Sequence, residues 1–310
     1  NTPSITDKIR DSVPTKIMSY ELHQPILRTK NGSSPGPDGV TGELLKFIHK
    51  HLPKSMLHLM GHFNEHGTEE FNLRLLKIIQ KPDKNQYLIL KSWRPISLIN
   101  TITKLFESIL YARLVYMLKN DKQTSFGTFV CENTAYQVGK STHDVYRELK
   151  DMTAQSILNN ESELMVLSLD MSSAFDVIHR DFTANLLKRM NLPDHFLDSL
   201  FRHFASVKAR IKGQETPDFL IESGVPQGSA LSSLLFILCL ALVLRTISNE
   251  AGIEPIKRSG IKKRQTEFLI KIGLPESTWA IIISYADDTN SCIQHKIEEF
   301  QKVTRSFHMW

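Results

Sequence analysis

The first half of the chain has the hydrophobic spacing of helices. Apolar residues recurring every three or four positions predict helices over about 41–50, 54–66, 102–119 and 141–158. Pro53 stands where the second of these helices would open, and Asn100 or Thr101 could cap the third. Ser, Pro, Gly and Asp crowd residues 33–39, which predicts a loop.

The second half differs because two short runs of consecutive apolar residues each end in acid. The runs 164–169 and 280–284 predict buried strands, and Asp170 follows the first while Asp287 and Asp288 follow the second. Alternating residues around a turn predict a hairpin of two strands, over about 209–212 and 219–222. Further helices are expected over about 179–190, 194–205 and 229–248.

Length and composition are those of a globular chain. The 310 residues suggest about two domains, and 41% hydrophobic with 23% charged residues exclude wholesale disorder. The longest apolar run, 234–244, is too short to cross a bilayer as a helix. The N-terminus has no signal-peptide pattern, and the 3 cysteines lie far apart without a C-x-x-C motif. We therefore expect an intracellular protein of the nucleus or cytoplasm, neither secreted nor in a membrane.

Charge is distributed unevenly along the chain. Residues 1–150 carry 21 Lys and Arg against 14 Asp and Glu, whereas residues 151–310 carry 17 against 19. Six basic residues and one acid, Asp83, lie within 74–94. A basic half joined to a slightly acidic half fits a polyanion that one part grips and the other processes. A solvated surface loop explains the 74–94 segment equally well.

The acids at the strand ends allow two interpretations. Asp is common in turns, so Asp170, Asp287 and Asp288 could simply end their strands. If the strands are neighbours, however, the three carboxylates converge on one edge of a sheet, where hard oxygen ligands favour Mg²⁺. Two such ions about 3.5–4 Å apart clamp the attacking and leaving oxygens of a phosphoryl transfer. Successive side chains of a strand face opposite ways, so the Asp pair serves this purpose only on a turn.

Six segments in chain order resemble motifs of the reverse transcriptases of non-LTR, LINE-type retrotransposons. They are 34–39 (SPGPDG), 93–98 (WRPISL), 135–142 (AYQVGKST), 169–176 (LDMSSAFD), 224–232 (GVPQGSALS) and 285–288 (YADD). The segment 224–232 is the most specific of them, and the match runs over nearly the whole chain. The family resemblance implies RNA-directed DNA polymerase activity.

The resemblance also implies roles for individual residues. Asp170, Asp287 and Asp288 would be the catalytic aspartates that bind two Mg²⁺ ions, with Mn²⁺ as an alternative metal. Phe175 would lie under the incoming sugar and disfavour a ribose 2′-hydroxyl. Gln227 and Gly228, with their loop, would contact the nascent base pair or nucleotide.

Two basic residues would bind the triphosphate. The resemblance assigns this role to Arg94 and to Lys81, with Lys77 and Lys84 as neighbouring alternatives to Lys81. The expected partners are an RNA template, a DNA primer and deoxynucleoside triphosphates. Other domains of a longer polyprotein, such as an endonuclease and a thumb, are expected as well.

The implied fold is α+β, a right-hand polymerase whose antiparallel palm sheet carries the aspartates. The fingers would span 1–163 and the palm 164–310, with the thumb missing because the chain stops soon after the YADD segment. Ser233 departs from the family pattern, which usually has Pro there. One alternative is an RNA polymerase or an intron maturase that uses the same palm. An RNA polymerase would usually lack a bulky aromatic at the position of Phe175. Another alternative is a catalytically silent RNA-binding remnant of such an enzyme.

Overall fold

The structure of the protein is a computed structural model that contains both helices and strands. It describes residues 13–81, 87–89, 92–120, 135, 139–158, 164–169, 175–176, 178–190, 192–205, 207–213, 217–225, 228–250, 279–285 and 288–294. This mixture confirms the expected α+β class. The chain divides into two units that interleave in sequence, Asn1–Asp121 with Phe175–Leu235, and Lys122–Ala174 with Phe236–Trp310. The fingers–palm boundary after residue 163 stays a prediction.

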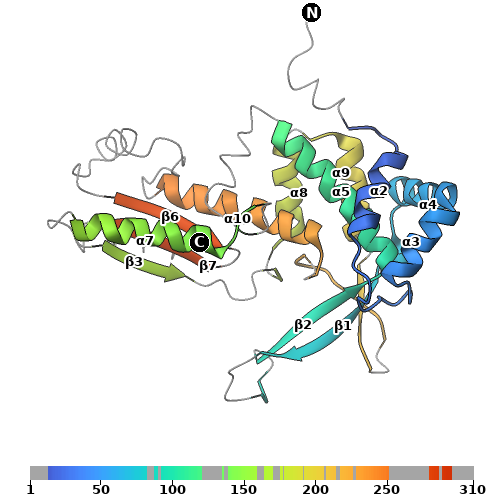
Figure 1. Ribbon diagram of the computed structural model, residues 1–310, viewed down its shortest axis with the longest axis horizontal. Coiled ribbons are helices and arrows are strands. Elements are labelled where there is room, and N and C mark those ends of the chain that lie inside the picture. The colour runs from blue at the N-terminus through green and yellow to red at the C-terminus, as the bar shows by residue number, and fades with distance from the viewer. Residues whose placement is uncertain are drawn as a thin grey trace, which may run out of the picture. The chain divides into compact units, whose positions relative to one another are not determined.

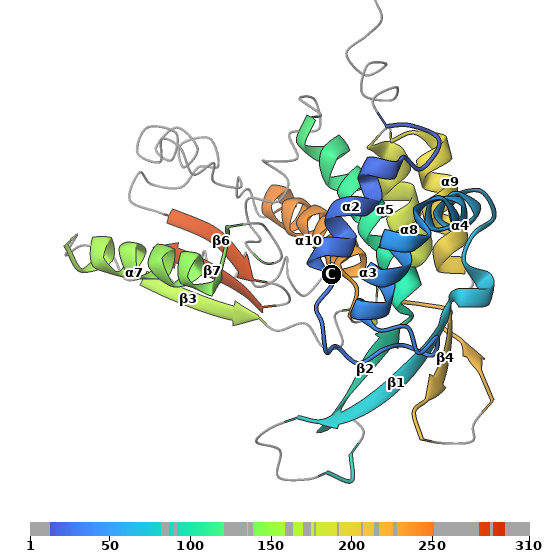
Figure 2. The same cartoon turned by 45° about the vertical axis from the view of Figure 1, so that its right-hand side comes forward.

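The first unit combines helices with a four-stranded sheet. Its helices are α2 (Ser19–Arg28), α3 (Gly42–His51), α4 (Pro53–His66), the 3₁₀ helix η1 (Glu69–Phe71), α5 (Thr101–Asn120), α8 (Arg180–Arg189) and α9 (Asp194–Ala205). Its strands are β1 (Leu73–Gln80), β2 (Trp93–Ile99), β4 (Lys208–Ile211) and β5 (Phe219–Leu220), in the order β2-β1-β4-β5. In Figures 1 and 2, β1 and β2 extend away from these helices as a long ribbon. The β4–β5 pair is the expected antiparallel hairpin.

Helix α5 forms the centre of the first unit's core. Its apolar residues Leu105, Phe106, Ile109 and Leu110 are all buried, as the helical spacing over 102–119 predicts. The ring of Phe106 meets Phe63 of α4 edge to face at 5.7 Å. Helix α5 therefore carries the side chains around which the unit packs.

The loop 33–39 contacts the start of α5, where Asn100 stands directly before the first helical residue, as expected. The Asn100 side chain accepts a hydrogen bond from the Asp38 amide (2.8 Å). The Asp38 carboxylate in turn accepts a long one (3.5 Å) from Ile102 in the first turn. A Cβ on Gly36 would lie 2.5 Å from the backbone of Ile99 and Asn100, so this close approach requires glycine. The capping carboxylate thus comes from a distant loop.

The second unit contains a three-stranded antiparallel sheet. Its elements are α7 (Thr142–Leu158), β3 (Leu164–Leu169), β6 (Trp279–Tyr285) and β7 (Asp288–Gln294), and the strand order is β3-β7-β6. The strands predicted at 164–169 and 280–284 are confirmed, and α7 packs against β3 and β6 (Figure 1). Helix α10 (Ala230–Glu250) runs through the division between the units. Within the described ranges, no helix has both the length and the apolar character needed to cross a membrane.

Candidate functional site

The strand ends that carry the predicted metal ligands meet at one edge of the second unit's sheet. Strand β7 is central, and β3 and β6 both run antiparallel to it. The last residue of β3, Leu169, pairs with Thr289, while the last residue of β6, Tyr285, pairs with Asp288. The carboxyl ends of β3 and β6 therefore lie beside the first residues of β7.

Two of the three predicted aspartates, Asp170 and Asp287, lie outside the described residues, as does Gln227. Asp170 follows Leu169 directly in the sequence, and only residues 286 and 287 connect β6 with β7. Asp288 is the first residue of β7. In the sequence, Asp170 directly follows the end of β3, and Asp287 directly precedes the start of β7, where Asp288 stands. These strand ends lie at the same edge of the sheet.

This donor set fits a hard divalent cation. Carboxylate oxygens are the ligands that Mg²⁺ prefers, and it is bound through one or two of them together with substrate phosphates. Among the described residues, which leave out Asp170 and Asp287, no three His, Cys, Asp or Glu side chains form a group that could hold a metal ion.

The structure brings the two predicted triphosphate ligands, Lys81 and Arg94, onto one β-hairpin in the first unit. In the β1–β2 register Ile79 pairs with Arg94, and the Lys81 amide donates to the Ser92 carbonyl (2.9 Å). Directly opposed residues of an antiparallel pair share a face, as do residues two apart in one strand. Lys77 therefore lies on the same face as Arg94, and both side chains are exposed.

The basic face of this hairpin continues onto β4. Leu75 of β1 pairs in parallel with Arg210, which places Arg210 and its neighbour two residues earlier, Lys208, on that face. Arg210 forms an ion pair with Asp218 (2.6 Å), and Lys208 lies 4.0 Å from Glu69. The positive charge is thus partly neutralised on β4, whereas no ion pair is recorded for Lys77 or Arg94 within the described part of the chain.

The loop 224–229 packs against the segment that begins with Phe175. The Val225 amide donates to the Phe175 carbonyl (2.9 Å), and the Gly224 amide donates to Ile178 (3.0 Å). Gly224 has φ +75°, and a Cβ there would lie 2.8 Å from the backbone of Asp176, so only glycine fits. Phe175, half-buried, and the start of this loop are therefore held together by backbone contacts.

The end of the same loop packs against β2. Gly228 has φ +115°, and a Cβ on it would lie 2.9 Å from the Ser97 carbonyl oxygen. A side chain at this position would therefore collide with β2 and strain the backbone. Ser97 is three residues from Arg94 on the same strand, so the loop and the hairpin form one continuous piece of the first unit.

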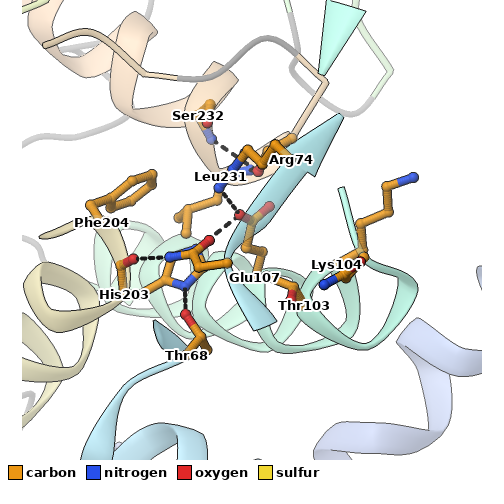
Figure 3. Close-up of polar contacts among 12 residues, drawn as sticks. Thr68, Arg74, Thr103, Lys104, Glu107, His203, Phe204, Leu231 and Ser232 are labelled. Carbon is orange, nitrogen blue, oxygen red and sulfur yellow. Dashed lines mark hydrogen bonds and ion pairs between the residues drawn. The ribbon is translucent and has the colours of Figure 1, made fainter. Parts of the chain in front are cut away.

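A buried polar network lies beneath this junction (Figure 3). The Arg74 guanidinium of β1 donates to Glu107 of α5 at 2.9 Å, and both side chains are nearly inaccessible to solvent. His203 of α9 places Nε2 2.9 Å from the same Glu107 oxygen and Nδ1 2.7 Å from the Thr68 hydroxyl. One carboxylate of α5 thus joins β1 and α9.

The electrostatics of the network favour an ionised Glu107. Burial alone would raise the pKa of its carboxyl, because it disfavours the charged form. The charge of Arg74, the contacts with His203 and the Ser229 hydroxyl outweigh burial and lower the pKa of Glu107 to about 2. For the Arg74 guanidinium, burial disfavours the charged form and therefore lowers the pKa.

Sequence reasoning missed this network, although the sequence carries a signal for it. Glu107 interrupts the apolar stripe of the helix over 102–119, and Arg74 interrupts the apolar run 73–79. A charge inside an apolar pattern is stable in a core only when it is paired. Two such interruptions of opposite sign are therefore a cue for a buried ion pair.

Comparisons with known proteins give a family and several relatives. The family model described as reverse transcriptase (RNA-dependent DNA polymerase) matches residues 79–310. The transposon TX1 uncharacterized 149 kDa protein of Xenopus laevis is 25% identical over 290 residues, which cover 92% of this chain and 20% of that protein.

Two relatives from Drosophila melanogaster are similar at the same level. The retrovirus-related Pol polyprotein from type-2 retrotransposable element R2DM is 25% identical over 73% of this chain and 20% of its own length. The probable RNA-directed DNA polymerase from transposon X-element is 25% identical over 70% of this chain and 24% of its own length. The chain therefore spans about a fifth to a quarter of the length of these curated relatives.

Proposed function

Because the chain belongs to the reverse transcriptase (RNA-dependent DNA polymerase) family, of the non-LTR retrotransposon type, we propose that it is the polymerase core of an RNA-directed DNA polymerase. In this proposal a primer 3′-hydroxyl attacks the α-phosphate of a deoxynucleotide, on an RNA template and with loss of pyrophosphate. The observation that carries the proposal is the meeting of the strand ends next to Asp170, Asp287 and Asp288 at one sheet edge.

Asp170, Asp287 and Asp288 would hold the metal ions in this proposal, Mg²⁺ first and Mn²⁺ as the alternative. The family is metal-dependent in general, and the oxygen donors at this edge suit such ions. Two bound cations would stabilise the attacking and leaving oxygens of the transfer. The three carboxylates contribute by fixing negative charge at a rigid sheet edge before substrate arrives.

The remaining residues of the proposal bind the nucleotide and nucleic acid. The β1–β2 hairpin would act as the fingers, with Lys81 and Arg94 on the triphosphate, and the loop with Gln227 and Gly228 would contact the nascent base pair. The basic face of β1, β2 and β4 suits the phosphates of template and primer, whose binding should weaken as salt rises. The β3-β7-β6 sheet would be the palm. Action inside the cell, in nucleus or cytoplasm, and partnership with further domains remain part of the proposal.

The test of the proposed function is primer extension by the chain on an RNA template with Mg²⁺, comparing deoxy- with ribonucleotides. Extension with deoxynucleotides is expected. Preference for ribonucleotides would favour the RNA polymerase alternative. RNA binding without any extension would favour the catalytically silent remnant, which the family and the names of the relatives do not support.

Arg94→Ala should raise the apparent KM for the deoxynucleotide by about tenfold or more, because a hydrogen bond to a charged group contributes roughly 1.5–3 kcal/mol. The planar guanidinium suits phosphate oxygens because it can bind two of them at once. Steady-state kinetics at fixed salt gives the KM, and fluorescence anisotropy gives the primer–template affinity. Lys188→Ala, which removes an exposed positive charge from α8, is the matched control and should change neither. Loss of primer–template affinity without a change in KM would make the hairpin a template clamp instead.

Phe175→Ala should raise ribonucleotide incorporation selectively. The ring would close the space for a 2′-hydroxyl and leave that hydroxyl without a hydrogen-bond partner. Its position beside the loop 224–229 supports this role. The measurement is kcat/KM for a matched deoxy and ribo pair, in the parent and in the variant.

The control for Phe175→Ala is Phe182→Ala, which removes an exposed ring from α8 in the same unit. The control should leave the ratio of deoxy to ribo kcat/KM unchanged. If Phe175 is only a packing residue, its truncation should depress both substrates together, and an unchanged ratio would exclude the sugar gate.

A further inference from the structure

We propose that Arg180 is a positioning residue that holds the start of the loop 224–229 against the segment 175–180. The inference rests on the proposed function, which assigns Phe175 to the nucleotide sugar and the loop to the nucleotide. Arg180 is the first residue of α8, and its guanidinium contacts both the loop and the last turn of α9. It would act on the nucleotide only through the backbone that it binds.

Both backbone polar groups of Gly224 are bound by the segment 175–180. The Gly224 amide donates to the Ile178 carbonyl (3.0 Å), and the Gly224 carbonyl accepts from Arg180 Nε (3.3 Å). The next amide, that of Val225, donates to the Phe175 carbonyl (2.9 Å). Three hydrogen bonds on two loop residues thus fix the start of the loop relative to Phe175. Only the one from Arg180 depends on a side chain, so a substitution can remove it.

The other end of the guanidinium is anchored to α9. Arg180 Nη1 donates to the carbonyl of Phe204 (2.9 Å), which lies in the last turn of that helix. The last four carbonyls of a helix have no partner within it and carry partial negative charge, so a cation there is favourable. Because the guanidinium is planar and rigid, the contact with Phe204 also fixes the direction in which Nε points. Arg180 therefore ties the loop to α8 and α9, which pack against each other.

These two carbonyls are the recorded partners of Arg180. Among the described residues it forms no ion pair, and its buried Nη2 has no hydrogen-bond partner. Burial, together with the positive charge of Arg74, lowers the pKa of Arg180 because both disfavour its charged form. A structural ion pair therefore does not explain this arginine, whereas the double contact with the loop and the helix end does.

Loss of the Arg180 side chain should loosen the loop at one end only. The opposite end stays in place because Gly228 rests on Ser97 of β2. The start of the loop would then move relative to Phe175, the residue proposed to close the space for a 2′-hydroxyl. We expect a poorer fit of the nucleotide and a weaker preference for deoxynucleotides, with primer–template affinity unchanged.

The test compares Arg180→Ala with Arg202→Ala. Arg202 of α9 also donates from its guanidinium to a backbone carbonyl, at 3.1 Å, but that carbonyl belongs to Asn64 of α4 and not to the loop. Arg180→Ala should raise the KM for the deoxynucleotide and lower the ratio of deoxy to ribo kcat/KM, each by roughly three- to tenfold. Arg202→Ala should leave both at the parent's values. Arg180→Lys should fall between parent and Arg180→Ala, because an ammonium lacks the planar fork that reaches two carbonyls.

Hydrogen exchange separates this inference from the proposed function, because it needs no activity. The amides of Gly224 and Val225 should exchange faster in Arg180→Ala than in the parent, and at the parent's rate in Arg202→Ala. If Arg180→Ala does not fold, Arg180→Lys carries the same comparison.

Equal effects of the two alanine variants on exchange and on KM would overturn the positioning role and leave only a stability role. Unchanged exchange of these two amides in Arg180→Ala would overturn it as well. If exchange responds as expected but the parent extends no primer, the proposed function fails while the anchoring of the loop by Arg180 stands.

Discussion

Asp287→Asn and Asp288→Asn should each reduce primer extension by about a thousandfold or more, since each 1.36 kcal/mol of lost transition-state stabilisation is tenfold in rate. The amide keeps the volume of the carboxylate but removes the charge that would hold a divalent cation. Asp288 is the first residue of β7 and pairs with Tyr285 at the sheet edge, and Asp287 directly precedes it in the sequence. Primer–template affinity should stay near that of the parent, because it depends on phosphate contacts to other parts of the chain.

The matched control is Asp151→Asn, which removes an exposed carboxylate from α7 in the same unit. Single-nucleotide extension rates and fluorescence anisotropy at one salt concentration give the chemistry and the affinity separately. The control should extend primers at the parent's rate. Parent-like extension by Asp287→Asn or Asp288→Asn would refute the metal assignment, and loss of affinity with the rate intact would assign these acids to nucleic-acid binding.

The sequence predicted those elements whose apolar residues follow one clear period. The helices over 41–50, 54–66 and 102–119 and the strands over 164–169 and 280–284 are all present, with ends shifted by at most one residue. The apolar stripe of each of these helices, and the continuous apolar run of each strand, follows a single period that the sequence shows directly.

The missed elements have patterns set by their neighbours in space. Strand β7, with the sequence DTNSCIQ, has almost no apolar pattern, yet it is central because β3 and β6 pair with it on both sides. Strand β2 contains Pro95, which an edge strand tolerates. Helix α2 contains Pro25, a residue that disfavours a helix interior, so the sequence pattern does not predict this helix. Tertiary pairing overrides local preference in these three segments.

In the candidate site, too, the sequence predicts individual residues but not how they are arranged in space. Motif resemblance identified Phe175, Gly228 and Arg94, but it could not predict that backbone contacts join the first two through the loop 224–229, or that Gly228 rests on the strand of Arg94. The β1–β2 hairpin brings Lys81 and Arg94, which are distant in the sequence, close to one another. Such proximities depend on register, and register is not visible in a single sequence.

Glu107→Leu should destabilise the chain by about 3–5 kcal/mol, because it leaves the Arg74 charge buried without a partner. Urea denaturation followed by circular dichroism gives the free energy of unfolding. The double variant Arg74→Met with Glu107→Leu should be more stable than either single variant, since two apolar side chains can replace a buried ion pair at little cost. Asp218→Asn, which breaks the half-exposed pair with Arg210, is the control and should cost less than about 1 kcal/mol.

The same pair predicts how stability responds to acid. The pKa of Glu107 is lowered from 4.5 to about 2 in the folded chain, so its contribution is fully present above the unfolded value and is lost as the pH falls from about 5 towards 2. The double variant lacks this carboxyl, so this part of the acid dependence should be absent from it. As the pH falls, the parent should therefore lose unfolding free energy relative to the double variant. If the difference stays constant between pH 5 and pH 2.5, Glu107 does not carry the charge that holds Arg74. In that case the buried ion pair between Arg74 and Glu107 cannot be maintained as described.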